Sequence, residues 1–360
     1  MVGLLAGAAL AAAVPTSTEI TAPGPQGPLA GTLLDPGGKA PVVVMLPGSG
    51  PTDRDGNSPL GITAAPYRLL AEALAAKGIA SVRVDKRGLF GSKGAIPDPN
   101  AVTVANYATD AHRWADTLRQ RTGRACVWLL GHSEGGIVAL KAAQQPAGVC
   151  GVILVSTPGQ PLGDTMRAQF RANPVNAPIL APALGMIDSL EAGKRVDPAT
   201  LPPPLPSLFP AAVQGYMIDL FAQRPAALAA ALKVPVLVLQ GDRDIQVGVE
   251  DARALAAAPG AKLVVVPGMT HVLKTATGEG RLANLATYRD SSLPLAPTVA
   301  DAIAAFVKRW PSASSSSLAK RKPPRSISSR AVGTSAAISA SVSVTLAGDG
   351  PHGSPCSALA

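Results

Sequence analysis

Gly131-His132-Ser133-Glu134-Gly135 decides the fold of this sequence, because these five residues join two segments of different character. Residues 126–130, Cys-Val-Trp-Leu-Leu, form a short apolar run that is typical of a buried strand. Residues 137–143, Ile-Val-Ala-Leu-Lys-Ala-Ala, favour a helix. A strand that turns sharply into a helix needs glycines beside the turn, since a tight bend leaves no room for side chains. We therefore predict that Ser133 lies exposed at a helix N-terminus, where free backbone N–H groups favour negative charge.

A serine hydroxyl becomes a nucleophile when a histidine removes its proton and a carboxylate orients that histidine. The chain has four histidines, and His271 directly follows the strand-like run at 264–266. The other three lie within the turn, in a charged helical stretch and in a low-complexity tail: His132, His112 and His352. The side chain of His132 is expected to point away from that of Ser133. By elimination, His271 is the expected base.

Two aspartates compete for the role of the carboxylate, because the strand-like run at 235–240 ends in Gly241-Asp242-Arg243-Asp244. Here the chain resembles the α/β-hydrolase superfamily, whose acid commonly occupies the fourth position of a G-x-x-D segment after the penultimate main strand. Asp244 matches this position, whereas Asp242 is expected to cap or brace the loop. The resemblance thus implies a triad of Ser133, Asp244 and His271, in the order expected for the superfamily.

A third segment, Pro47-Gly48-Ser49-Gly50-Pro51, follows the strand-like run at 41–46. In the resembling family the loop at this place usually begins His-Gly and contributes one N–H to the oxyanion hole. Pro47 replaces that histidine, a departure that costs little because the main chain donates the hydrogen bond. By position, the resemblance implies the backbone N–H groups of Ser49 and Glu134 as the oxyanion donors. A flexible Gly/Pro turn without a role is the alternative.

Charged residues gather in the same region, at Asp53-Arg54-Asp55 and at Asp85-Lys86-Arg87. The second segment, with Gly88, Gly91 and Ser92 after it, resembles the D-x-R-G-x-x-G-S loop of bacterial members of the superfamily. The charges nearly cancel, which favours an ion-pair scaffold that holds the oxyanion loop. Binding of an anionic substrate group is the alternative.

The remaining apolar runs alternate with helical patterns, which is typical of an α/β fold with a mainly parallel sheet flanked by helices. We assign residues 18–157 and 231–310 to this core, and the resemblance implies the α/β-hydrolase fold. Residues 158–230 interrupt the alternation where that family often inserts a helical cap. The insert contains three of the five phenylalanines, which either line an acyl or aryl pocket or pack the cap onto the core: Phe170, Phe209 and Phe221.

The composition and the two end segments of the chain bear on nucleic-acid binding, membrane insertion and export. The net charge of +9 is spread without a basic run outside residues 311–360, so no nucleic-acid partner is expected. Residues 1–17 contain an alanine-rich apolar stretch too short to cross a bilayer, where about 20 residues are needed. We expect a signal segment there and an exported protein, although the positive n-region is missing and a cytoplasmic location stays open. Residues 311–360 are expected to be a disordered tail.

The three cysteines show no metal-binding spacing. Cys126 and Cys150 open consecutive predicted strands, so they either form a disulfide, as an exported protein allows, or remain two buried thiols.

Within the α/β-hydrolase superfamily, the chain looks most like bacterial serine carboxylesterases with a helical cap. This resemblance covers residues 18–310. This resemblance implies hydrolysis of a small acyl or aryl ester through an acyl-enzyme, without a metal or organic cofactor. It implies no stable membrane span and indicates no particular oligomeric state. On the same three residues, a thioesterase, lysophospholipase, peptidase or acyltransferase is the alternative, and outside enzymes an inactive ligand-binding relative.

Overall fold

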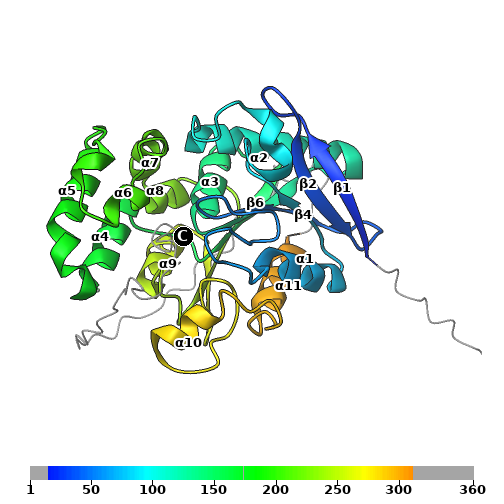
Figure 1. Cartoon of the computed structure of the whole chain (residues 1–360). Helices are drawn as coiled ribbons and strands as arrows, with labels where there is room; N and C mark the ends of the chain where they lie inside the picture. Colours follow the sequence, from blue (N-terminus) through cyan, green and yellow to red (C-terminus); the bar gives the residue numbers. More distant parts are fainter. Residues whose placement is uncertain (1–14, 173, 311–360) are drawn as a thin grey trace, which may run out of the picture.

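The computed structural model describes residues 15–172 and 174–310, which are built around one eight-stranded sheet (Figure 1). The strands lie in the order β1-β2-β4-β3-β5-β6-β7-β8. β1 and β2 form an antiparallel hairpin, β2 pairs antiparallel with β4, and the other neighbours are parallel. The bounds are β1 Thr16–Ala22, β2 Leu29–Asp35, β3 Val42–Leu46, β4 Ala80–Val84, β5 Val127–His132, β6 Val149–Val155, β7 Val236–Gly241 and β8 Lys262–Val266.

Helices cover both faces of this sheet, as the sequence predicts for an α/β fold. Successive side chains of a strand point to opposite faces, so Val42 and Val44 of β3 join the apolar cluster on one face of the sheet, while Val43 and Met45 join the cluster on the other face. A strand buried on both faces reads as a continuous apolar run. The core helices are α1 Pro66–Ala76, α2 Val104–Thr122, α3 Glu134–Ala142, α9 Val249–Ala256, α10 Gly280–Ala286 and α11 Val299–Arg309, with a 3₁₀ helix η1 at Phe90–Ala95.

Between β6 and β7 the chain leaves the sheet and forms a group of helices beside it (Figure 1). These insert helices are α4 Leu162–Ala172, α5 Leu180–Glu191, α6 Leu205–Leu208, α7 Gln214–Phe221 and α8 Pro225–Ala230, with η2 at Pro174–Ile179 and η3 at Pro198–Thr200. They have an apolar cluster of their own, in which Phe170, Phe209 and Met186 are buried. The insert is thus a small packed unit attached to the core.

Parts of the two predicted end segments lie outside the described residues, namely residues 1–14 of the signal segment and the whole 311–360 tail. Residues 16 and 17 of the former belong to β1. Within the described part of the chain, every helix is too short or too polar to span a bilayer.

Candidate active site

Ser133 lies at the sharp turn between β5 and α3, with φ 53° and ψ −123°. This backbone conformation is strained for a residue with a side chain, and such strain often marks a functional position. The neighbouring glycines permit the turn: a Cβ on Gly131 would lie 2.1 Å from the carbonyl oxygen of Gly135, and one on Gly135 would lie 2.2 Å from that of Leu46. The sequence motif therefore forms the predicted strand-turn-helix around Ser133. The predicted exposure is wrong: Ser133 is buried, because it faces a cavity that residues of the segment between β6 and β7 also line.

His271 follows β8 and forms a hydrogen bond from Nδ1 to Oδ2 of Asp244, at 2.8 Å. The Asp244 side chain is fully buried, and its Oδ1 accepts the backbone N–H groups of Gln246 and Val247 at 2.8 and 3.0 Å. Burial by itself would raise the pKa of Asp244, but His271 and these two N–H groups lower it below its usual value. Asp244 is therefore a carboxylate built to orient an imidazole.

Asp242, the other candidate, lies in a different environment. Its carboxylate is exposed and accepts the backbone N–H of Gly268 at 2.6 Å. This contact ties the loop after β7 to the loop after β8. Asp242 thus braces the loop that carries His271 and makes no hydrogen bond to its ring within the described residues.

Gly48 lies in the loop after β3, and both its backbone N–H and its carbonyl are hydrogen-bonded. Its N–H donates to the Tyr67 hydroxyl at 3.1 Å, and its carbonyl accepts from Nζ of Lys86 at 2.6 Å. The Gly48 carbonyl and the Ser49 N–H belong to one trans peptide and point in opposite directions. The ammonium of Lys86 therefore fixes the direction in which the Ser49 N–H points.

The Gly48 loop lies against the Ser133 turn: a Cβ on Gly48 would be 3.3 Å from the Cβ of Ser133. Within the described residues, the backbone N–H groups of Ser49 and Glu134 have no hydrogen-bond partner. Two free donors thus belong to residues that line the same cavity as Ser133.

That cavity has a volume of about 320 Å³ and separates Ser133 from the insert helices. Its walls are mostly apolar, with Met166 of α4, and Met217 and Phe221 of α7 among them. Phe170 and Phe209 do not line it; their rings stack on each other, with centroids 6.4 Å apart, inside the apolar cluster of the insert. The structure therefore brings one of the three phenylalanines to the cavity.

Comparison with known proteins decides the family. A family model described as the alpha/beta hydrolase family matches residues 43–273, which is more than half of the chain. The chain belongs to the alpha/beta hydrolase family.

Individual relatives share only part of their sequence with this chain. Esterase EstD of Thermotoga maritima is 28% identical over 258 residues, which are 69% of this chain and 58% of the relative. The chain therefore spans less than two thirds of the length of that relative. The solved structure of Est1E from Butyrivibrio proteoclasticus has a TM-score of 0.50 at 18% identity, covering 81% of this chain and 98% of that one. For an esterase from Pyrococcus furiosus the TM-score is 0.50 at 17% identity, with 82% and 91% covered. These two structures share the fold.

His132 links the separate loops of the candidate site, a role that the sequence did not indicate. Its Nδ1 accepts the Tyr67 hydroxyl at 2.8 Å, and its Nε2 donates to the backbone carbonyl of His271 at 2.8 Å. Burial, followed by the charge of His271, lowers the pKa of His132 to about 3, so the ring is neutral. The chain of bonds from Gly48 through Tyr67 and His132 to His271 couples the Gly48 loop to the histidine loop.

The charged segments near the Gly48 loop are paired within the protein. Asp85 is bound by Arg54 at 2.5 Å, and Arg87 forms two hydrogen bonds to Asp110 at 2.6 and 2.7 Å. Arg83 pairs with Asp55. These contacts support the scaffold interpretation over binding of a substrate anion, because the guanidinium groups already hold carboxylates.

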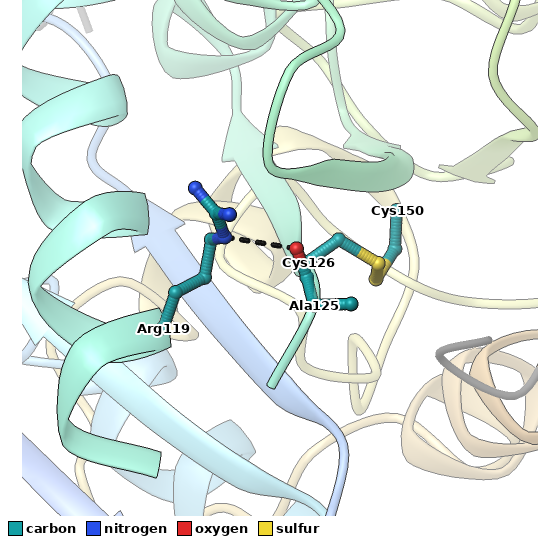
Figure 2. Close-up of a disulfide and its surroundings, with 4 residues drawn as sticks. All are labelled: Arg119, Ala125, Cys126 and Cys150. Atoms are coloured by element: carbon teal, nitrogen blue, oxygen red, sulfur yellow. Dashed lines mark hydrogen bonds between the residues drawn. A yellow bond between two sulfur atoms is a disulfide. The ribbon is translucent and has the colours of Figure 1, made fainter. Parts of the chain in front are cut away.

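A disulfide joins Cys126 and Cys150 (Figure 2). It lies at the opposite end of the strands from Ser133, which follows β5. Cys126 immediately precedes β5, and Cys150 lies in β6. Next to it, the Arg119 guanidinium of α2 donates to the Ala125 carbonyl at 2.8 Å (Figure 2). Of the two states that the sequence left open, the structure has the disulfide, and this bond fixes the start of the strand that leads to Ser133.

Proposed function

We propose that this hydrolase cleaves carboxylic esters through an acyl-enzyme on Ser133. The observation that carries the proposal is the Asp244–His271 pair, whose loop is bonded through His132 to the turn that presents Ser133. The name of one relative, Esterase EstD, favours esters over other acyl compounds. The residues would act in the manner of a serine, histidine and aspartate triad.

In the first half of the reaction, Nε2 of His271 takes the Ser133 hydroxyl proton as the oxygen attacks the ester carbonyl. The carbonyl π electrons move to oxygen, and the N–H groups of Ser49 and Glu134 stabilise that oxyanion. Asp244 stabilises the imidazolium that forms, and the depressed pKa of its carboxyl keeps it ionised. Collapse of the tetrahedral species breaks the bond to the alcohol, which leaves with the proton from His271.

In the second half, His271 removes a proton from water, and the resulting hydroxide attacks the acyl-Ser133 carbonyl. The second tetrahedral species releases the carboxylic acid, and the proton returns to the Ser133 oxygen. The described residues of the chain, together with water, supply every group in this sequence.

The insert helices would serve as a cap that encloses the acyl or aryl part of a small ester. Met166, Met217 and Phe221 give the wall a deformable apolar surface. A wall of this kind discriminates substrates by the fit of apolar groups, which contributes about 1–3 kcal/mol per methylene.

The test is hydrolysis of a series of 4-nitrophenyl esters, thioesters and anilides by the wild type and by Ser133→Ala. We expect ester hydrolysis to dominate, and the Ser133→Ala change to lower kcat by about 10⁴-fold or more with the fold retained. Ser156→Ala is a matched control, because Ser156 also ends a parallel strand with a positive φ of 48°. Absence of ester turnover in the wild type, or equal loss in both variants, would overturn the proposal.

We propose further that the protein works in an oxidising compartment outside the cytoplasm. The Cys126–Cys150 disulfide supports this location, because such bonds persist mainly in exported proteins. Thiol counting under denaturing, non-reducing conditions should find one free thiol per chain, and three only after reduction. Three free thiols in protein taken directly from the source cell would contradict this.

A further inference from the structure

The side chain of Glu134 is a buried charge that the proposed reaction leaves unused, since that reaction involves only its backbone N–H. The residue is 3% exposed. Its carboxylate lies 3.6 Å from Nζ of Lys86, whose side chain is also buried. A buried ion pair adds little to stability by itself, because the loss of hydration offsets the attraction between the charges. Stability alone therefore does not account for this pair beside Ser133.

Lys86 connects the Glu134 carboxylate to the loop that carries the other proposed oxyanion donor. Its Nζ donates to the Gly48 carbonyl at 2.6 Å, and that carbonyl shares one peptide with the Ser49 N–H. Glu134 begins α3 and carries the second donor on its own backbone. One ammonium thus contacts the carboxylate of one donor residue and the peptide of the other. This contact bridges two loops that lie far apart in the chain.

Two tyrosines restrict the movement of the Lys86–Glu134 pair. The hydroxyl of Tyr216, on α7, hydrogen-bonds the Glu134 carboxylate. Burial, followed by the charge of Glu134, raises the pKa of Tyr216 well above its ordinary value, so the hydroxyl keeps the proton that it donates. Nζ of Lys86 lies 5.8 Å from the ring centroid of Tyr107, on α2, at the distance of a cation–π contact. The two rings meet edge to face, with centroids 5.7 Å apart.

We propose that the Glu134 carboxylate is a positioning group for the oxyanion hole. It holds the Lys86 ammonium against the Gly48 carbonyl, and this contact keeps the Ser49 N–H in a fixed place relative to the Glu134 N–H. The inference rests on the proposed esterase function and extends the role of Glu134 from its backbone to its side chain. Preorganised donors are effective because they need no rearrangement when negative charge develops on the carbonyl oxygen.

Glu134→Gln tests the proposal, because it removes the charge and keeps both the backbone N–H and an oxygen that Tyr216 can bond. We expect kcat and kcat/KM for 4-nitrophenyl butyrate to fall by the same factor, about tenfold, since the interaction acts on the transition state. The inhibition constant of butylboronic acid, which forms a tetrahedral adduct with a reactive serine, should rise in parallel. Glu72→Gln is the matched control, because it removes a carboxylate from an exposed pair with Arg68 on α1, and it should change none of these values.

A double-mutant cycle with Lys86→Met shows whether the carboxylate acts through Lys86. If it does, adding Glu134→Gln to Lys86→Met should change kcat by less than about twofold, because the ammonium that the carboxylate holds is gone. Tyr216→Phe is the second variant, for the case that Glu134→Gln leaves Lys86 unpaired and does not fold. It keeps the ion pair and removes one hydrogen bond, so it should lower kcat about threefold at unchanged KM.

Three results would overturn the inference. The first is a folded Glu134→Gln with the kcat and boronic acid affinity of the wild type, or with a raised KM at unchanged kcat. The second is a loss from Glu134→Gln that is as large in the Lys86→Met background as in the wild type. The third, where Glu134→Gln does not fold, is a Tyr216→Phe variant with wild-type kcat. Absence of ester hydrolysis by the wild type would instead overturn the proposed function.

Discussion

The α/β core and the insert helices build their parts of the site by different means. In the core, buried polar groups pair at short distances: Asp244 with His271 at 2.8 Å, and Lys86 with the Gly48 carbonyl at 2.6 Å. In the insert, apolar side chains such as Phe170 and Phe209 form a separate cluster, and few of them reach the cavity. The core thus fixes geometry through hydrogen bonds of definite direction, whereas the insert supplies shape.

This difference predicts which amino-acid substitutions each region tolerates. A hydrogen-bonded buried network loses function when one partner is removed, because the remaining group is left unpaired. An apolar wall accepts substitutions of similar volume with small losses. Variants of the core should therefore alter the rate for every ester, and variants of the insert should alter the choice among esters.

The largest effect is expected from the two aspartates of the loop after β7. Asp244→Asn should lower kcat by about 10⁴-fold, because an amide in place of the carboxylate favours the wrong tautomer of His271. Asp242→Asn is the matched control and should mainly lower stability, since Asp242 binds the Gly268 N–H. Steady-state kinetics of both purified variants measure this, and the reverse ranking would give the role to Asp242.

Phe209 and Phe221 separate packing from pocket wall within the insert. Either change to alanine should lower the free energy of unfolding by about 3–5 kcal/mol, because both rings are buried in the insert cluster. Only Phe221→Ala should also change the ratio of kcat/KM between short and long acyl esters, by about tenfold, since only Phe221 lines the cavity. A shift of equal size in Phe209→Ala would show that the insert acts on selectivity as a whole.

The polar core should be more sensitive to acid than the apolar insert. The pKa of His132 is lowered to about 3 by burial, and then by the charge of His271, while an unfolded histidine titrates near 6.5. The unfolded chain therefore binds one more proton between these values, and stability present above pH 6.5 falls as the pH decreases. The slope from this group is about 1.4 kcal/mol per pH unit.

Urea unfolding between pH 6 and 4.5 measures that slope. His132→Asn should have a flatter dependence than the wild type, whereas His112→Asn, on α2, should keep the steep one. If both variants keep the wild-type slope, His132 is not the buried neutral group described here.

A smaller effect is expected from Lys86, which orients the Gly48–Ser49 peptide. Lys86→Met should lower kcat about tenfold, less than the roughly 10²–10³-fold loss that removal of a whole oxyanion donor causes. Affinity for a boronic acid that mimics the tetrahedral species should fall in parallel. Lys262→Met, at an exposed position of β8, is the control. Weaker substrate binding at unchanged kcat would assign Lys86 to the cavity wall alone.

The sequence predicted the fold and the positions of Ser133 and His271 because each follows a continuous apolar run. Runs of this kind become parallel strands whose carboxyl ends lie at one edge of the sheet. The choice of Asp244 over Asp242 needed the family resemblance. Both aspartates lie in one loop, and the sequence does not show which of the two side chains points toward His271. The structure distinguishes them through Gly268, which holds Asp242 away from the ring of His271.

The contacts that surround these residues were beyond prediction, because they join distant parts of the chain. Tyr67 meets His132 across 65 residues, and Lys86 meets Gly48 across 38. No local pattern marks such pairs. Composition of the insert likewise did not separate Phe221 from Phe209, because the orientation of each short helix is set by its packing and not by its own sequence.

The central claim is the proposed catalytic pairing of Ser133 with His271. The most direct test of it is to identify the residue that reacts with a fluorophosphonate. Peptide mapping of the labelled wild type should find a single adduct, on the peptide that contains Ser133. His271→Ala, with its fold checked by circular dichroism, should label at least 10²-fold more slowly, because the general base is gone. An adduct on another serine, or labelling of His271→Ala at the wild-type rate, would contradict the account.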